Sequence, residues 1–435
     1  MTTLPAEVVG ESYRFTRGWR TLQSLVDIGN RMAGSDGEQR AIQTMVDTFE
    51  EIGLDGVGVD AFEIPGWFRG ESSLSLPDRD RHFTGSHEII GLPGTPAGSV
   101  TAPLVDVGHG TPTEFRAGDV EGRLVIASSG TPDDFDRWLH RREKYDMAVE
   151  GGAAGFLFRN HVPGCLPPTG GIGGQSGKGE IPGVGISREL GRRLVRYCES
   201  DTAEGTLEVD ATVADAESGN VSGRLGPDTE QEILVTAHHD AHDIAEGARD
   251  NGSGCAIVVA VASMLAGIED DLDTGIRFQT FGAEEVGLRG SREMVADGNL
   301  DEIAAIINCD AIGSTRDLGV FTHGFDGLGA AFEDAGDALN VPVELREEVE
   351  PHSDHWPFVR QGVPGVMAYS AGESDDRGWG HTHGDTLDKV DRRDLRDLAI
   401  PVAEAVARLA TGEYGGSHVD PETVAERARE EGYEV

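Results

Sequence analysis

The sequence predicts an α/β fold: a mostly parallel mixed sheet sandwiched by helices, with a β-rich insert. From about residue 216, short apolar runs typical of buried strands alternate with helical segments, which favours a largely parallel sheet covered on both faces. Several of these runs end abruptly in histidine or acidic residues, as strands do where open α/β sheets build active sites. Residues 98–215 differ, because Gly/Pro turns separate short β-type runs there.

Residues 17–54 are expected to form two helices, because apolar residues recur there at helical spacing. The link between them, GNRMAGSDGEQ, is rich in turn residues, and Ser35 and Asp36 are suited to cap the second helix. A strand should follow at Val57–Ile64. From about residue 70 to 97, Pro and Gly break short alternating runs, which indicates a change of domain.

The rest of the chain is expected to alternate between strands and helices. Two helices are expected within residues 98–215, at Phe135–Glu150 and Arg188–Cys198. The strands expected after residue 216 are Ile233–Ala237, Gly275–Phe281, Ile303–Cys309, Leu318–Thr322 and Val363–Tyr369. The helices expected there are Ser253–Ala266, Gly290–Asp297, Leu328–Leu339 and Asp391–Ala410. The acidic tail from Glu413 predicts a loosely held helix or disorder.

The charge balance is strongly acidic: 78 acidic against 36 basic side chains give a formal net charge of −42, and only three lysines occur. Such a surface stays hydrated in concentrated salt, so we expect a halophilic protein. Nucleic-acid binding is disfavoured, because phosphate contact needs a basic stripe. No apolar run reaches about 18 residues and no signal segment opens the sequence, so we expect a cytoplasmic protein that does not enter a membrane.

Side chains that bind metals follow the apolar runs at several places. They are His238, Asp240 and Asp250 around one run, and Glu284, Glu285, Asp310, His381 and Asp385 after others. Charged groups at the ends of apolar strands are costly unless something compensates for their charge. A pair of divalent metal ions would do so, and the sequence therefore predicts a two-metal site.

Such a pair, about 3.5–4 Å apart, requires a carboxylate that bridges both ions and further His and carboxylate ligands for each. Imidazole combined with carboxylate oxygen favours zinc, with cobalt or manganese as substitutes. A general base must also stand beside the bridging water without being used as a ligand. Adjacent carboxylates such as Glu284 and Glu285 can divide these roles, because neighbouring residues at a strand end point in different directions.

These motifs, in this order, resemble the zinc-dependent exopeptidase family that includes bacterial leucyl aminopeptidase, aminopeptidase Y and plasma glutamate carboxypeptidase. The matching stretches are His238 to Asp240, Arg249 to Gly254, Ala283 to Ser291, Asp310 to Gly313, Ser353 to Phe358 and His381 to Thr386. The runs VDVG, GRLVIA, GAAGFLF and IPGVGIS also resemble a protease-associated domain. The resemblance implies a catalytic domain formed by residues 1–69 and 216–412, a protease-associated insert at 70–215, and an acidic C-terminal tail at 413–435.

Residue by residue, the resemblance implies that His238, Asp250 and Asp310 hold one zinc ion. Asp250, Glu285 and His381 would hold the second, with Asp250 as the bridge. Glu284 would be the general base that takes a proton from the metal-activated water, and Asp240 would hydrogen-bond His238 and set its tautomer. The implied activity is that of a two-zinc aminopeptidase, which hydrolyses peptide bonds at the ends of peptide substrates.

Other functions stay open at this stage. A carboxypeptidase or dipeptidase of the same family would share these ligands, and the sequence does not identify the side-chain preference. A one-zinc acyltransferase that resembles glutaminyl cyclase is disfavoured, because both His238 and Asp310 are retained. A non-catalytic peptide-binding protein is disfavoured because no ligand is lost. The insert is expected either to cap the cleft or to mediate contacts in a homodimer.

Neighbours of the motifs are harder to assign. Arg249 departs from the family pattern, and we expect it either to pair with the bridging carboxylate or to reach toward the substrate. His239 and His242 are expected to be flanking polar residues rather than ligands. Ser353 and the two residues after it are expected to form a pocket wall or hydrogen bonds, because no GxSxG elbow precedes them.

Overall fold

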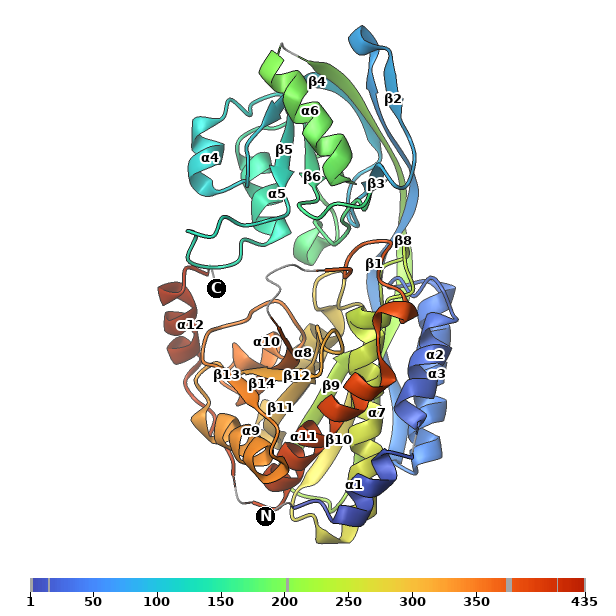
Figure 1. Cartoon of the computed structure of the whole chain (residues 1–435), viewed down its shortest axis with the longest axis vertical. Helices are drawn as coiled ribbons and strands as arrows, with labels where there is room; N and C mark the ends of the chain where they lie inside the picture. Colours follow the sequence, from blue (N-terminus) through green and yellow to red (C-terminus); the bar gives the residue numbers. More distant parts are fainter. Residues whose placement is uncertain (1–2, 15, 201–202, 373–377, 413, 434–435) are drawn as a thin grey trace.

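Strands from most of the chain form one mixed sheet in the computed structural model, which describes residues 3–14, 16–200, 203–372, 378–412 and 414–433. Within these residues the sheet has 14 strands in the order β13-β12-β14-β11-β9-β10-β8-β4-β5-β6-β7-β3, with β1 beside β8 and β2 beside β1. Figure 1 shows two lobes stacked along the long axis, with β1 and β8 running between them. The predicted α/β fold with a large mixed sheet is confirmed.

The lower lobe of Figure 1 contains the strands of this sheet that follow β8 in the sequence. Its parallel strands are β9 (Glu232–His238), β10 (Gly275–Phe281), β11 (Ile303–Cys309) and β14 (Gly365–Ala371). The strand β12 (Asp317–Phe321) pairs antiparallel with β14 and carries β13 (Val343–Arg346) at the edge. Each strand predicted after residue 216 is present within two residues at either end, because buried strands are short apolar runs with polar or turn residues at their bounds. The strand predicted at Val57–Ile64 is longer than expected and runs from Asp55 to Leu76.

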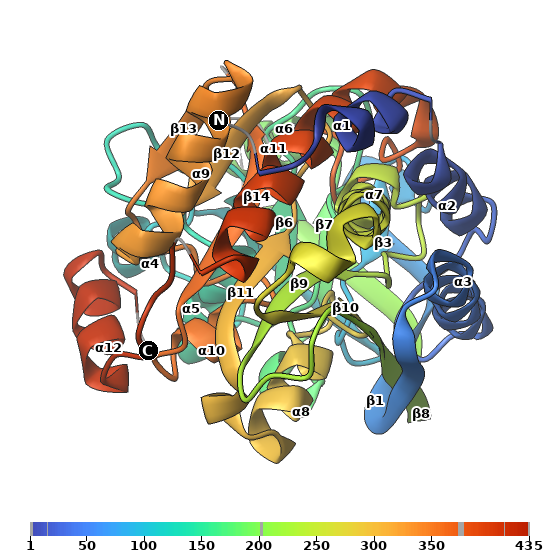
Figure 2. The same ribbon diagram turned by 90° about the horizontal axis from the view of Figure 1, so that it is seen from below.

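Helices cover both faces of this part of the sheet, as Figure 2 shows. One face carries α7 (Ser253–Leu265), α9 (Asp326–Leu339) and α11 (Arg392–Ala410). The other face carries α8 (Arg289–Asp297) and the short α10 (Trp356–Val359). The four predicted helices of this region are therefore confirmed, with ends that differ by at most two residues.

The helix α7 is the central core helix of the lower lobe. Eleven of its 13 residues are buried, and it packs against α2 and α11. Among the described residues, Ala248–Asp271, which contains α7, is the one helical stretch long and apolar enough to cross a membrane by length and composition alone. Because 78% of the most apolar part of this stretch is buried inside the fold, core packing explains its hydrophobicity.

The N-terminal helices pack on the same lobe. They are α1 (Ala6–Ser12), α2 (Arg17–Val26) and α3 (Asp36–Ile52). The hydroxyl of Ser35 accepts a hydrogen bond of 3.1 Å from the backbone N–H of Glu38, so Ser35 caps α3 as predicted. Two helices are therefore present within residues 17–54, as their apolar spacing predicts.

Two long antiparallel strands connect the lobes: β1 (Asp55–Leu76) and β8 (Glu204–Leu225), each of 22 residues. At about 3.3 Å per residue, a strand of this length spans roughly 70 Å, enough to belong to both lobes. The pairing runs from Asp55 opposite Arg224 to Ser75 opposite Thr206. The predicted domain boundaries at residues 69/70 and 215/216 lie inside these strands, so the chain passes between the lobes without a flexible linker there.

The upper lobe is the insert, and its strands are mainly parallel. They are β4 (Gly98–Asp106), β5 (Leu124–Ser128), β6 (Gly155–Arg159) and β7 (Gly183–Ile186), with β3 (Ile89–Gly91) antiparallel at the edge and β2 (Arg81–Phe83) beside β1. Its helices are α4 (Pro112–Ala117), α5 (Arg141–Glu150) and α6 (Arg188–Ser200).

One helix of the insert begins later than predicted. The helix expected at Phe135–Glu150 starts at Arg141, and residues 135–140 are irregular. The side chain of His140 caps α5, because it accepts a hydrogen bond of 3.2 Å from the backbone N–H of Arg142. The apolar residues Phe135 and Trp138, which precede the cap, belong to a loop that faces the other lobe.

The acidic tail contains a helix, α12 (Pro421–Glu430), capped by Asp420. Val424 and Ala428 on this helix are buried. Just beyond it, the carbonyl of Gly432 accepts a hydrogen bond of 2.9 Å from Arg137 of the insert. The tail thus touches both lobes.

Candidate active site

Three parallel strands bring predicted ligands to one edge of the sheet. The strand β9 ends in His238, β10 is followed by Glu284 and Glu285, and β11 is followed by Asp310. His238 is paired with Phe281, the last residue of β10. Because neighbouring parallel strands have their carboxyl ends at the same edge, these side chains converge although they are distant in sequence.

Asp250 reaches the same place from the irregular turn that precedes α7. The carboxylate of Asp385 holds this turn, because it accepts hydrogen bonds from the backbone N–H groups of Arg249 (2.8 Å) and Asp250 (3.1 Å). The sequence places Asp385 close to His381 but predicts no role for it. In the structure it positions the backbone of the predicted bridging ligand.

His381 is held partly by the insert. The backbone N–H of Thr169 donates a hydrogen bond of 2.8 Å to the carbonyl of His381. The carbonyl of Thr169 lies 3.3 Å from Nδ1 of His381, and Nη1 of Arg141, also from the insert, lies 3.4 Å from the same nitrogen. With Nδ1 occupied in this way, Nε2 is the nitrogen directed at the site.

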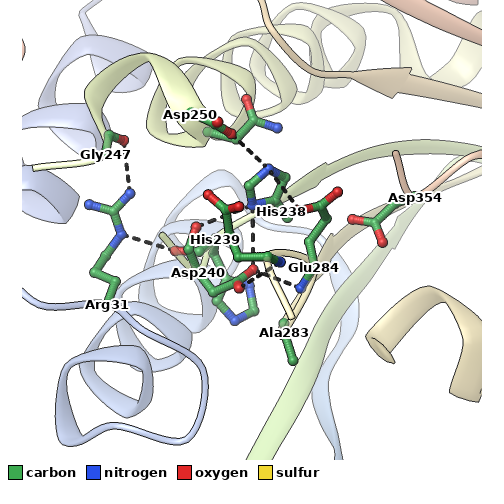
Figure 3. A network of polar contacts seen from close by, with 12 residues as sticks. Arg31, His238, His239, Asp240, Gly247, Asp250, Ala283, Glu284 and Asp354 are labelled. Carbon is green, nitrogen blue, oxygen red and sulfur yellow. Dashed lines mark hydrogen bonds and ion pairs between the residues drawn. The ribbon is translucent and has the colours of Figure 1, made fainter. Parts of the chain in front are cut away.

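The predicted ligands form two adjacent groups that share Asp250. In the first group, Nε2 of His238 lies 3.3 Å from Oδ1 of Asp250 (Figure 3) and 3.7 Å from Oδ1 of Asp310. In the second, Nε2 of His381 lies 3.0 Å from Oδ2 of Asp250 and 3.1 Å from Oε2 of Glu285. The two oxygens of Asp250 therefore face different groups, which is the arrangement that a bridging carboxylate requires.

The donor chemistry of both groups fits divalent metal ions. Nε2 of His238 and Oε1 of Glu285 are buried and have no hydrogen-bond partner among the described residues. Although burial acts to raise the pKa of Asp250, His381 and His238 outweigh it and hold that pKa well below its usual range. Imidazole nitrogens and ionised carboxylates are the ligand types that zinc prefers, and a cation here would give the unpartnered atoms a partner.

Glu284 lies beside the first group. Its Oε2 is 3.9 Å from Nε2 of His238, and 10% of its side chain is exposed. Burial raises the pKa of Glu284 well above its usual value in spite of His238, and the charges of Glu285, Asp354 and Asp310 add to the rise. A carboxylate that lies next to the ligands and lines the cleft is suited to accept and return a proton.

Asp240 does more than the sequence predicted. Its Oδ1 lies 3.4 Å from Nδ1 of His238, close to the expected interaction, but the carbonyl of Asp240 lies nearer to that nitrogen, at 3.2 Å. The carboxylate also accepts hydrogen bonds from the backbone N–H groups of Glu284 (3.1 Å) and Glu285 (3.2 Å), as Figure 3 shows in part. Asp240 therefore ties the end of β9 to the turn after β10.

The flanking residues with open roles differ from one another. His239 points away from both groups, with Nδ1 3.1 Å from the hydroxyl of Thr280, and burial lowers its pKa to about 3. His242, in contrast, lies against Glu285, with 2.8 Å between Nε2 and Oε2. Arg249 lines the cleft and makes no ion pair with Asp250 among the described residues, so it faces the space available to substrate.

No sequence pattern indicates a role in the site for Arg31, and two roles are open for Ser353 from the sequence alone. Arg31 lies in the turn between α2 and α3, where nothing in the sequence indicates a link to the site. It donates hydrogen bonds to carbonyls of the segment that follows β9, among them that of His239 (3.0 Å). The hydroxyl of Ser353 donates a hydrogen bond of 2.5 Å to Oδ2 of Asp310, which agrees with the hydrogen-bonding role expected for it.

A cleft of about 1520 Å³ opens over the two groups and separates the lobes. Trp356, Tyr369 and Trp379 of the lower lobe line it. Trp138 and His140 line it from the insert. The insert therefore forms one wall of the cleft, as one of the two roles expected for it requires.

Comparisons with known proteins agree with this geometry. The family model for peptidase family M28 matches residues 220–406, and the PA domain model matches residues 100–194. Aminopeptidase YwaD of Bacillus subtilis is 28% identical over 408 residues, which cover 91% of this chain and 84% of the relative. Carboxypeptidase Q of Bos taurus is 27% identical over 404 residues, which cover 88% and 83%.

Solved structures give the same answer for the fold. A zinc aminopeptidase from Bacillus subtilis superposes with a TM-score of 0.72 at 27% identity, over 92% of this chain and 95% of that chain. An M28 peptidase precursor from Shewanella amazonensis superposes with a TM-score of 0.76 over 95% and 96%, and at 22% identity it supports the fold alone. Residues 220–406 match peptidase family M28 and residues 100–194 match the PA domain, so the chain combines an M28-like peptidase domain with an inserted PA domain.

Proposed function

We propose that this peptidase is a two-zinc aminopeptidase in which Glu284 is the general base. The observation that carries the proposal is the pair of ligand groups that share Asp250, with Glu284 beside them at the floor of the cleft. Relatives named aminopeptidase, and a solved zinc aminopeptidase of similar fold, support the choice of metal and of reaction.

Each residue of the site has a distinct proposed role. His238 and Asp310 would hold one zinc ion, His381 and Glu285 the other, and Asp250 both. When bound, the ions lower the pKa of a water molecule and polarise the carbonyl of the scissile bond, and cobalt or manganese would supply the same chemistry. Asp240 and Asp385 keep the ligand-bearing turns in place through backbone hydrogen bonds.

Glu284 would transfer a proton from the attacking water to the leaving group. Its Oε2 would accept a proton from the attacking water and then donate it to the amine nitrogen of the leaving group. The carboxyl of Glu284 can carry the proton for the interval between the two transfers, because it lies beside the ligand groups without being one of the ligands.

The decisive test is Glu284→Gln, measured together with the surface control Glu293→Gln on α8. The glutamine variant should keep its bound zinc and lose peptidase activity by about 10²–10⁴-fold, since it removes only the proton acceptor. The control should keep both. Full activity of Glu284→Gln with its zinc in place would refute the assignment of the base.

A carboxypeptidase or dipeptidase is the second candidate, and one observation favours it. Arg292 and Arg360 of the lower lobe and Arg142 of the insert line the same cleft. Burial and the neighbouring charges of Arg360 and Arg142 lower the pKa of Arg292, and neither Arg292 nor Arg360 has an ion-pair partner among the described residues. Guanidinium groups gathered in so acidic a protein are suited to bind a carboxylate of the substrate.

Peptides with a free N-terminus, a blocked N-terminus or a blocked C-terminus separate these candidates when assayed in molar KCl with zinc or cobalt. An aminopeptidase should cleave C-blocked peptides and fail on N-blocked ones. The opposite pattern would replace the aminopeptidase by a carboxypeptidase, and cleavage of free dipeptides alone would indicate a dipeptidase. Failure to cleave any peptide would favour a binding protein, and a single zinc per chain would favour the cyclase-like acyltransferase.

A further inference from the structure

His242 occupies an unusual position for a residue outside the motifs of the family. It lies four residues beyond the end of β9, and its ring is buried. Its Nε2 lies 2.8 Å from Oε2 of Glu285, and its ring meets that of His381 edge to face, with 4.5 Å between the centroids. The ring is therefore in direct contact with two predicted ligands of the second group.

The contact with Glu285 does not have the geometry of a hydrogen bond. Both ring nitrogens of His242 are buried without a hydrogen-bond partner among the described residues, although Oε2 of Glu285 is close. An imidazole nitrogen this near an oxygen, with its bond direction aimed elsewhere, is unfavourable in a protein interior. A metal ion bound by both the ring nitrogen and the carboxylate oxygen would remove this cost.

The spacing of these atoms is that of a metal site. His242, Glu285 and His381 each offer one ligand atom, and these atoms lie within 4.8 Å of one another. Bonds of about 2.0–2.1 Å to a tetrahedral zinc place neighbouring ligand atoms roughly 3.3 Å apart. The separations from Oε2 of Glu285 are 2.8 Å to His242 and 3.1 Å to His381, close to that value.

The chain holds this segment from two sides. Asp243, the next residue, forms an ion pair of 2.6 Å with Arg69 on β1, and both side chains are largely buried. The same guanidinium donates a hydrogen bond of 3.2 Å to the hydroxyl of Thr169 in the insert. The backbone on the C-terminal side of His242 is thereby anchored, which limits how far its ring can move from Glu285.

We propose that His242 is an additional ligand of the second metal position, beside His381, Glu285 and the shared Asp250. This position would then have four protein ligands, whereas the position of His238 and Asp310 would have three. Metal positions that are closed by protein ligands bind tightly and hold structure, while open ones leave room for water and substrate. The second position should therefore fill first, and the open coordination should lie beside His238 and Glu284.

The inference rests on the metal binding of the proposed function but not on its peptidase activity, so metal binding is the measurement. Metal-free protein is titrated with zinc against a chromophoric chelator, and X-ray absorption at one equivalent of zinc counts the imidazole ligands. We expect two imidazoles for the unchanged protein and one for His242→Ala. The affinity for the first zinc should fall at least 10–100-fold in that variant, a loss known even for groups that only support a ligand.

Two further variants separate a ligand from a residue that merely supports Glu285. His242→Gln keeps a hydrogen-bond donor near Glu285 but lacks an imidazole, so it should restore neither the affinity nor the second imidazole signal. Its full recovery of zinc affinity would overturn the proposal. His383→Ala, a histidine of a neighbouring loop outside both groups, is the matched control and should bind the first zinc as the unchanged protein does.

The outcomes distinguish this inference from the proposed function. If His242→Ala binds the first zinc with unchanged affinity and the same number of imidazoles, the ligand role of His242 is refuted while the two-metal peptidase stands. If the unchanged protein binds no zinc, the proposed function fails as well. Thermal unfolding of each metal-free variant, followed by circular dichroism, verifies that the protein compared is folded.

Discussion

Replacing Arg31 by methionine should loosen the segment between β9 and α7, which carries the site. The guanidinium of Arg31 is completely buried and donates to the carbonyls of Leu25 (3.1 Å), His239 (3.0 Å), Glu246 (2.6 Å) and Gly247 (2.9 Å). Figure 3 shows two of these bonds, to His239 and Gly247. One side chain thus joins the turn before α3 to both ends of the segment that follows His238.

The size of the effect follows from these contacts. Leaving a buried carbonyl without a donor costs about 1–3 kcal/mol. The carbonyls of His239 and Glu246 lose the donor shown for them, whereas that of Leu25 keeps the N–H of Ile28 and that of Gly247 keeps the N–H of Gly252. Part of this cost is offset, because methionine does not need to be charged in the interior, whereas burial of Arg31 is unfavourable enough to lower its pKa. We therefore expect the free energy of unfolding to fall by about 2–4 kcal/mol.

Urea denaturation in molar KCl, followed by circular dichroism, measures this loss, and a chelator competition measures zinc affinity. Arg31→Lys should give an intermediate result, because an ammonium keeps the charge but cannot reach carbonyls in the directions of the guanidinium fork. Arg20→Met, an exposed arginine on α2, is the control and should change the free energy of unfolding by less than about 0.5 kcal/mol. A loss below about 1 kcal/mol for Arg31→Met would contradict the reasoning.

Three further perturbations test other parts of the molecule. Asp240→Asn should lower zinc affinity by about 10–100-fold, measured by chelator competition, because an amide cannot accept both backbone N–H groups and still face His238. Burial lowers the pKa of Lys144 to about 7. A lysine in the unfolded chain keeps its proton up to about pH 10, whereas Lys144 in the folded protein loses it above about pH 7. Because the unfolded state binds more protons between these values, the free energy of unfolding should rise there by as much as about 1.4 kcal/mol per pH unit. Lys144→Met should lack this rise in urea denaturation measured across that range. Finally, the melting temperature should increase as KCl is raised from 0.1 M to 1 M, because the screening length falls from about 10 Å to 3 Å and the repulsion within a net charge of −42 weakens. A melting temperature independent of KCl would remove the argument for halophilic adaptation.

Residues 135–150 show where a sequence pattern loses its value. Phe135 and Trp138 have helical spacing, yet they belong to a loop whose side chains line the cleft, and α5 begins only after His140. Contacts with the other lobe outweigh the local pattern there. The tail forms the helix α12, one of the two states expected for it, and Val424 and Ala428 of this helix are buried against the lower lobe.

The sequence by itself determined the order of the strands and helices of the lower lobe and the residues at the ends of its strands. These follow from apolar runs, and parallel strands must gather their carboxyl ends at one edge. The convergence of His238, Glu284, Glu285 and Asp310 is therefore a consequence of where the apolar runs end. The family resemblance of the motifs identified Asp250 as the shared carboxylate.

Only the tertiary structure decided what surrounds these residues. Arg31, Thr169 and His242 reach the site from a turn, from the insert and from a loop, and none of them stands at a strand end or in a recognisable motif. Their roles depend on distances between segments far apart in the chain, and hydrogen bonds of this kind leave no periodic pattern in the sequence. The physical reason is that a buried carbonyl or ring nitrogen must find a partner wherever packing brings one near, and packing is a property of the whole fold.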